Sequence, residues 1–221
     1  MNRKYSQYFY GSILSLAITS CSLLTIRVMT MEMPILDQWA SPFVQHVDGT
    51  FIFRLFRWIT ELGSGSFLTP FSLVMGLFLW LYYKDSLAAC VIVIGTYTGY
   101  LANYGIKLLV ERERPRILAE AEGVGHSFPS GHAMVALIAY GLFTYFLIKH
   151  AKSKQIAIVI NVIGIVMILL IGFSRYVIRV HYLTDVLAGY SFGALFLFAW
   201  IGIYHLLSKI KISFFSVSRR R

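Results

Sequence analysis

The chain has 221 residues, of which 57% are hydrophobic and 14% are charged, and its formal net charge is +10. This composition excludes a water-soluble domain with an ordinary polar surface, because too few charged residues remain to cover one. It also argues against nucleic-acid binding, since the basic residues stand between apolar stretches and do not form the basic patch of a soluble surface. The surrounding solvent is therefore expected to be lipid.

Six apolar segments reach or approach the length of roughly 20 residues that a helix needs to cross the hydrocarbon core. They are expected at residues 8–29, 67–83, 87–109, 132–148, 155–173 and 185–207. The segment 30–66 mixes prolines, tryptophans and charges, and it predicts short helices lying on the bilayer surface. The expected fold class is all-α: a six-transmembrane-helix bundle with short interfacial helices between the first and second spans, forming a single domain over residues 1–221.

The positions of lysine and arginine predict the orientation of this bundle. With the N-terminus placed inside, the inner face carries one acid, Asp85, and 11 basic residues: Arg3, Lys4, Lys84, Lys149, Lys152, Lys154, Lys209, Lys211, Arg219, Arg220 and Arg221. The outer face then holds nine basic and nine acidic residues, so the whole positive excess and both termini are expected in the cytoplasm. Residues 18–21 loosely resemble a lipoprotein cleavage site, but cleavage there would remove the first span, which we expect to stay as an anchor.

Two pairs of glycines stand four residues apart within predicted spans. Gly95 and Gly99 lie in the third span, and Gly189 and Gly193 lie in the sixth. This spacing is typical of close helix contacts in membranes. It predicts either packing inside the bundle or a seam between two copies, and we favour packing inside the bundle.

Three polar clusters stand at the ends of the last four predicted spans. They are Lys107 with Arg114, then Pro-Ser-Gly-His at residues 129–132, then Ser174 and Arg175 with His181 and Asp185. Charge at membrane depth is costly and is usually paired or functional. The first two clusters flank the connection between spans three and four, and the third occupies the connection between spans five and six. All three therefore fall on the same face, here the extracytoplasmic one.

Three cations in these clusters predict a site for an oxyanion. Arg114 and Arg175 carry planar guanidinium groups suited to phosphate oxygens, and Lys107 adds a third charge. Lys107 and Arg114 are seven residues apart, so they would share a helix face if the third span extends that far. Ser130 and Gly131 stand at the apparent start of the fourth span, where backbone N–H groups and the helix dipole favour an anion.

Two histidines supply reactive groups for phosphoryl transfer. His181 and Asp185 are four residues apart, so a helical turn would bring the carboxylate to the imidazole, fix its tautomer and aim a nucleophilic nitrogen at phosphorus. His132 would protonate the leaving oxygen as the general acid, and water would later hydrolyse the phosphohistidine. No carboxylate cluster suited to two metal ions stands in these loops, so we expect neither a metal nor another cofactor.

The three clusters resemble the signature of the type 2 phosphatidic acid phosphatase superfamily, K-x(6)-R-P, P-S-G-H and S-R-x(5)-H-x(3)-D. The sequence matches it in order at residues 107–115, 129–132 and 174–185. The resemblance implies a membrane bundle of six helices and a lipid phosphatase. It also implies roles for eight residues: phosphate binding by Lys107, Arg114, Ser130, Gly131 and Arg175, acid catalysis by His132, nucleophilic attack by His181, and orientation of that nucleophile by Asp185.

Four residues near the motifs lie outside the signature. Arg112 and Arg116 flank the motif arginine, and neighbouring glutamates balance their charge. We expect them on a solvated loop face and keep recognition of a second phosphate or headgroup as the alternative. Arg179 and Leu183 stand where relatives commonly have smaller residues, at positions with no catalytic role in the signature.

The membrane setting and the resemblance point to a lipid phosphate as substrate, and to no nucleic acid or obligate protein partner. Phosphatidylglycerophosphate ranks first and undecaprenyl diphosphate is a close second. Two other functions stay open: a phosphate or anion transporter, and a catalytically inactive lipid-binding relative. The sequence lacks the internal repeat of many transporters, and it keeps both histidines and the aspartate of the signature. Single residues also have ordinary explanations, such as Ser130 as a helix N-cap.

Overall fold

The computed structural model describes residues 3–31, 33–115 and 125–218, with side chains at residue 8 and from 11 to 210 within those ranges. In this part of the chain all regular secondary structure is helical, as predicted. Arg116 and the terminal Arg219, Arg220 and Arg221 lie outside the described residues, as do the side chains of Arg3, Lys4 and Lys211.

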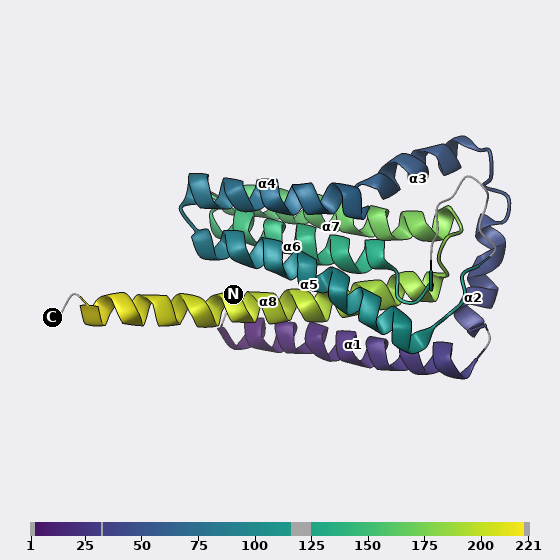
Figure 1. Cartoon of the computed structure of the whole chain (residues 1–221), viewed down its shortest axis with the longest axis horizontal. Coiled ribbons are helices and arrows are strands. Elements are labelled where there is room, and N and C mark those ends of the chain that lie inside the picture. Colours follow the sequence, from purple (N-terminus) through teal and green to yellow (C-terminus); the bar gives the residue numbers. More distant parts are fainter. Residues whose placement is uncertain (1–2, 32, 116–124, 219–221) are drawn as a thin grey trace.

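Six long helices form the bundle, and each contains a segment long and apolar enough to cross a membrane (Figure 1). They are α1 (Arg3–Thr30), α4 (Gly65–Tyr83), α5 (Ser86–Val110), α6 (Gly131–Lys149), α7 (Lys154–Val177) and α8 (Leu183–Ser218). All six predicted spans are confirmed. Three of them, α4, α5 and α6, start and end within two residues of the prediction, whereas α1 begins earlier and both α7 and α8 run further at their C-terminal ends.

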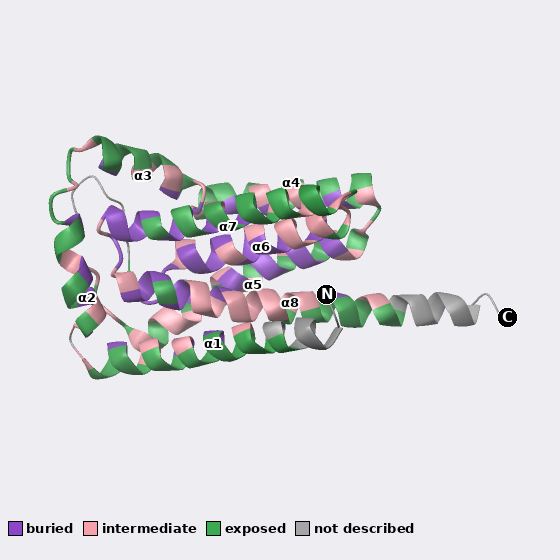
Figure 2. Ribbon diagram, turned by 180° about the vertical axis from the view of Figure 1, so that it is seen from behind, coloured by how far each residue is buried: buried purple, intermediate pink, exposed green. Residues whose placement is uncertain are grey.

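Helix α6 is the central element of the bundle, since it packs against α4, α5, α7 and α8. Met134, Ile138, Leu142 and Phe146 recur every four residues along it and are fully buried. This spacing places them on one face of the helix, where they build the largest hydrophobic cluster with residues of α4, α5 and α8. Figure 2 shows the buried positions gathered on these inner helices.

The paired glycines pack inside the bundle, as favoured from the sequence. A Cβ on Gly189 would lie 2.7 Å from the carbonyl oxygen of Ser130, and one on Gly193 would lie 2.8 Å from that of Met134. Cβ atoms on Gly95 and Gly99 would similarly press on side chains of α6. Because lipid gives helices little hydrophobic reason to associate, such close backbone approach is a main source of their packing energy.

Short helices close one end of the bundle, as predicted for residues 30–66. They are α2 (Ile35–Ala40), the 3₁₀ helix η1 (Ser41–Val44) and α3 (Phe51–Glu61). Helix α2 packs against α8, and α3 packs against α7. Helix α3 buries Phe53 and Thr60 while it exposes Phe51 and Trp58, a distribution typical of a helix at a membrane surface.

The opposite end of the bundle is held by Asp85, in the turn between α4 and α5. Its carboxylate accepts hydrogen bonds from the Ala88 N–H at 2.9 Å, the Tyr204 hydroxyl at 2.6 Å and the Lys149 ammonium at 2.9 Å. One side chain therefore caps α5 and ties its start to α6 and α8. The three sequence motifs all lie at the other end, beside α2 and α3 (Figure 1).

Candidate active site

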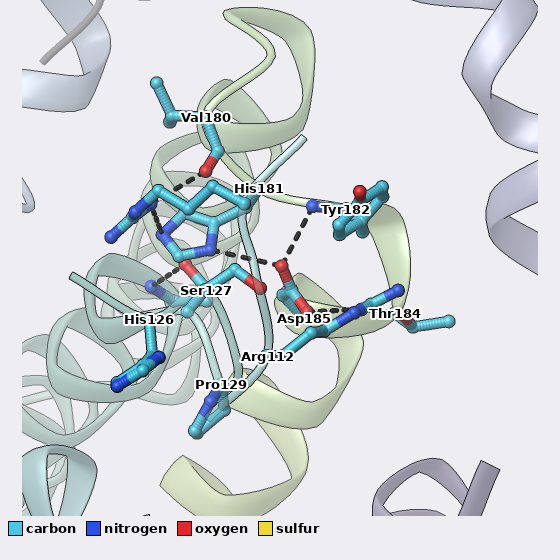
Figure 3. A network of polar contacts seen from close by, with 12 residues as sticks. Arg112, His126, Ser127, Pro129, Val180, His181, Tyr182, Thr184 and Asp185 are labelled. Atoms are coloured by element: carbon cyan, nitrogen blue, oxygen red, sulfur yellow. Dashed lines mark hydrogen bonds and ion pairs between the residues drawn. The ribbon is translucent and has the colours of Figure 1, made fainter. Parts of the chain in front are cut away.

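The polar clusters predicted from the sequence meet at the end of the bundle closed by α2 and α3. The charge of Lys107 interacts with those of Arg114, Arg175 and Asp185. His132 lies in the same electrostatic field, since it interacts with the three cations and with His181. The two connections that carry the motifs thus form one site, as the counting of spans predicted (Figure 3).

His181 lies in the connection between α7 and α8, two residues before α8 begins. The chain turns back on itself here: the N–H groups of Val180 and His181 both donate to the Arg175 carbonyl at 3.1 Å, and Arg179 has a left-handed φ of 61°. The expected helical turn between His181 and Asp185 is therefore wrong. Their side chains still meet, because the turn directs His181 Nδ1 to within 3.3 Å of Asp185 Oδ2.

The contacts of His181 define its tautomer. Its Nε2 lies 3.2 Å from Arg114 Nη1, and since a guanidinium group can only donate, Nε2 is the acceptor. The proton is then on Nδ1, facing the carboxylate of Asp185. Burial, together with the charges of Arg114, Arg175 and Lys107, lowers the pKa of His181 well below its ordinary value. The imidazole is therefore neutral at pH 7 and presents a lone pair on Nε2.

Arg114 reaches the site from a loop and not from a helix face. Glu111 takes a left-handed φ of 49° and ends α5 at Val110, so the expectation that Lys107 and Arg114 share a helix face is wrong. Instead Arg114 lies beyond the end of α5, and its Nε donates to the Gly125 carbonyl at 2.8 Å while Nη1 donates to that of Val180 at 2.7 Å. Burial lowers the pKa of Arg114 from its ordinary value.

The start of α6 brings Ser130, Gly131 and His132 to the site. Ser130 is fully buried, and its hydroxyl oxygen accepts from the Ala133 N–H at 3.5 Å, so the ordinary N-cap explanation is confirmed. A Cβ on Gly131 would lie 3.0 Å from Asn103 Oδ1. A larger residue at this position would therefore have to displace the Asn103 amide.

Two further contacts fix this end of α6. The Ser130 N–H donates to the Asp185 carbonyl at 3.0 Å, which ties the start of α6 to the start of α8. Asn103 Nδ2 donates to the Pro129 carbonyl at 3.2 Å. Asn103 was not singled out from the sequence, since an asparagine in an apolar helix has no spacing that marks it as part of a site.

Lys107 and Arg175 complete the cationic group. Lys107 Nζ donates to the His126 carbonyl at 2.6 Å. Arg175 lies near the end of α7 and is buried, and its Nη1 donates to Thr60 Oγ1 at 2.9 Å. Thr60 belongs to α3, so the short helices that precede α4 contribute directly to the site. No sequence pattern pointed to this contact.

Arg112 is the main correction to the sequence-based interpretation. Its side chain is only 8% exposed, and the predicted solvated position is wrong. Nη1 donates to Asp185 Oδ1 at 2.5 Å and to Thr184 Oγ1 at 2.8 Å, and Nη2 donates to Asp37 Oδ2 at 2.7 Å. The guanidinium carbon also lies 4.0 Å from the centre of the Tyr182 ring. Arg112 is thus a buried bridge between two carboxylates, and Figure 3 shows the end of this bridge at Asp185.

His181 borders a cavity of about 220 Å³ between α2, η1 and the connection from α7 to α8. Met33, Val44 and Leu183 give it apolar walls, and the half-buried Arg179 adds a positive charge. This combination suits a phosphorylated headgroup attached to an apolar chain. Among the described residues, no three His, Cys, Asp or Glu side chains are grouped as ligands for a metal ion.

Known proteins have similar sequences and a similar fold. The PAP2 superfamily model matches residues 86–209. Phosphatidylglycerophosphatase B of Bacillus subtilis is 39% identical over 144 residues, which are 63% of this chain and 69% of that protein. The crystal structure of a transmembrane PAP2-type phosphatidylglycerolphosphate phosphatase from Bacillus subtilis superposes with a TM-score of 0.79 and 29% identity, over 86% of this chain and 94% of the other. The chain therefore belongs to the PAP2 superfamily and is a membrane phosphatase.

Proposed function

We propose that this protein removes the terminal phosphate from phosphatidylglycerophosphate through a phosphohistidine intermediate. The observation that carries the mechanism is the placement of His181, whose Nδ1 faces Asp185 while Nε2 lies 3.2 Å from Arg114. A phosphoryl group held by that arginine lies next to the nucleophilic nitrogen. The choice of substrate is supported by the names of the Bacillus subtilis relative and of the similar crystal structure.

The first half of the reaction transfers the phosphoryl group to the enzyme. His181 Nε2 attacks phosphorus, and the bond from phosphorus to the glycerol oxygen breaks. His132 donates a proton to that oxygen, so phosphatidylglycerol leaves with a free glycerol hydroxyl group and not as an alkoxide. Asp185 stabilises the positive charge that develops on the imidazole.

The surrounding donors stabilise the transferred group. Lys107, Arg114 and Arg175 bind the equatorial oxygens, and Ser130 and Gly131 present the start of α6 to the anion. In the second half, His132 takes a proton from water as the oxygen attacks phosphorus. The P–N bond then breaks, which releases inorganic phosphate and restores neutral His181.

The site is proposed to face the extracytoplasmic side of the cell membrane, with both termini in the cytoplasm. Support comes from the excess of lysine and arginine in the termini and in the connections on the opposite side. Single cysteines test this in a protein lacking Cys21 and Cys90. We expect an impermeant thiol reagent added to intact cells to label Asp48→Cys, and to label Lys152→Cys only after the cells are opened. The reverse pattern would overturn the orientation.

The substrate is tested by phosphate release from purified protein in detergent. The substrates are phosphatidylglycerophosphate, undecaprenyl diphosphate and phosphatidic acid, and their kcat/KM values are compared. We expect phosphatidylglycerophosphate to give the highest value. A higher value for undecaprenyl diphosphate would replace the substrate but keep the chemistry, whereas inactivity on all three would contradict a lipid phosphatase.

The intermediate is tested separately by quenching turnover in alkaline denaturant, in which a phosphohistidine is stable. Phosphate should be trapped on the protein in an acid-labile form, and His181→Ala should abolish both this species and turnover. Near-normal turnover by His181→Ala would exclude the phosphohistidine.

A further inference from the structure

We propose that Asp37 is a positioning residue for the reaction, acting through Arg112 on Asp185 and hence on His181. The proposal rests on the roles proposed above for His181 and Asp185. Asp37 belongs to α2, far in sequence from all three motifs. It is nevertheless 1% exposed and lies two side chains away from the nucleophile.

The geometry forms a continuous chain of contacts. The guanidinium group of Arg112 divides its two terminal nitrogens between the carboxylates, with Nη2 on Asp37 Oδ2 and Nη1 on Asp185 Oδ1. Asp185 uses its other oxygen to accept from the Tyr182 N–H at 2.9 Å and to face His181 Nδ1. The two oxygens of Asp185 thus have different hydrogen-bond partners, and the contact with Arg112 fixes the orientation of the carboxylate.

Charge makes this arrangement depend on Asp37. Both carboxylates are buried, and a buried charge is costly unless an opposite charge lies against it. Arg112 is shared between the two acids, so the negative charge of Asp37 weakens the electrostatic attraction between Arg112 and Asp185. Without the negative charge of Asp37, Arg112 pairs with Asp185 alone. The stronger pull on Oδ1 then weakens the hold of Asp185 on the Nδ1 proton of His181.

Asp37 also contacts the start of α8, which gives it a structural role to be separated from the positioning role. Its Oδ1 accepts from the Thr184 N–H at 2.9 Å, and its Oδ2 accepts from the Thr184 hydroxyl at 2.5 Å. Asparagine at position 37 has nearly the same shape and keeps an oxygen for the Thr184 N–H. Asp37→Asn therefore removes the charge facing Arg112 with the least damage to this contact.

The main test compares Asp37→Asn with Asp48→Asn, a matched control at an exposed acid of the same segment. We expect Asp37→Asn to lower kcat about 10- to 100-fold, the usual range for a residue that orients a reactive ligand, with KM changed less than about twofold. Phosphoenzyme formation should slow by the same factor. Asp48→Asn should leave both parameters unchanged.

A double-mutant cycle distinguishes positioning from a general loss of structure. If Asp37 acts through Asp185, then Asp37→Asn should reduce kcat less than about threefold in a protein that already carries Asp185→Asn. Losses that multiply in the double variant would overturn the proposal. So would an Asp37→Asn protein that keeps at least half of the wild-type kcat.

If Asp37→Asn does not fold, a second variant tests the same positioning role. Arg112→Lys keeps a cation but loses the fork that contacts both carboxylates at once. It should show the same selective loss of kcat, and full kcat in this variant would overturn the proposal. Failure of the proposed function is recognised separately, since it would appear in the unsubstituted protein as no turnover, or in His181→Ala as normal turnover.

Discussion

Replacing Asp185 with asparagine is expected to lower kcat about 10³-fold, because the amide cannot satisfy the donors that surround it. The carboxylate accepts from Arg112 Nη1 on one oxygen, and from the Tyr182 N–H and His181 Nδ1 on the other. Asparagine offers one acceptor oxygen and one NH₂ group. Arg112 cannot lose its protons, so the amide oxygen is expected to turn toward it, and the NH₂ group then faces His181.

The imidazole can avoid this conflict only by moving its proton from Nδ1 to Nε2. That proton would face Arg114, another donor, and would occupy the nucleophilic lone pair. A comparable asparagine substitution in a serine-protease triad lowers kcat by about 10⁴. The contact from His181 Nδ1 to the carboxylate is long here, at 3.3 Å, so we expect a smaller loss of about 10³, or about 4 kcal/mol at 1.36 kcal/mol per tenfold change.

Steady-state phosphate release and the phosphoenzyme trapped by alkaline quench measure this loss. Both should fall together, since the substitution impairs the attack of His181 on phosphorus. A thermal melt in detergent serves as the control for folding. A folded Asp185→Asn protein that loses less than tenfold in kcat would refute the assigned tautomer and the role of the carboxylate.

Three further predictions concern pH, packing and metal ions. Because burial lowers the pKa of His181, the nucleophile stays neutral as pH falls through 6.5, so the acid limb of kcat/KM should lie below that pH; a limb at or above 6.5 would contradict this. Gly63→Ala would place a Cβ 2.3 Å from Ile171 Cγ2 and 3.0 Å from His132 Cδ2. It should lower activity at least tenfold, whereas Gly65→Ala, with its nearest contact at 3.7 Å, should not; equal activities would show that the site tolerates the shift. Activity should persist in excess EDTA, and a strict requirement for magnesium would count against the metal-free mechanism.

The elements with a strong local signal were predictable from the sequence. The six spans follow from runs of apolar residues. Residues such as His181 and Asp185 stand out because charged and polar side chains are rare near membrane spans, and because the three motifs follow one another in the order of the family signature. The spacing of Gly189 and Gly193 predicted a close helix contact, but it suited a seam between two copies as well as the packing inside the bundle that the structure shows.

The contacts that could not be predicted join residues far apart in the chain. Arg112 is 75 residues from Asp37, and Arg175 is 115 residues from Thr60. Neither pair has a periodic spacing, and an arginine between glutamates is typical of a solvated loop. The helix face proposed for Arg114 was wrong for a related reason: Glu111 ends α5 in a left-handed conformation, and a glutamate is not a residue type that predicts this conformation.

The support of the site by α2 and α3 limits how freely this protein can be recombined with its relatives. The superfamily model covers residues 86–209, yet Asp37 and Thr60, which hold Arg112 and Arg175, precede that region. A hybrid that joins residues 86–209 to the N-terminal third of another family member would keep every motif but exchange both supports. Such hybrids should reach the full catalytic rate only when the donor supplies a carboxylate and a hydroxyl at the same two places. The motifs and the N-terminal third are therefore expected to be inherited as one catalytic unit.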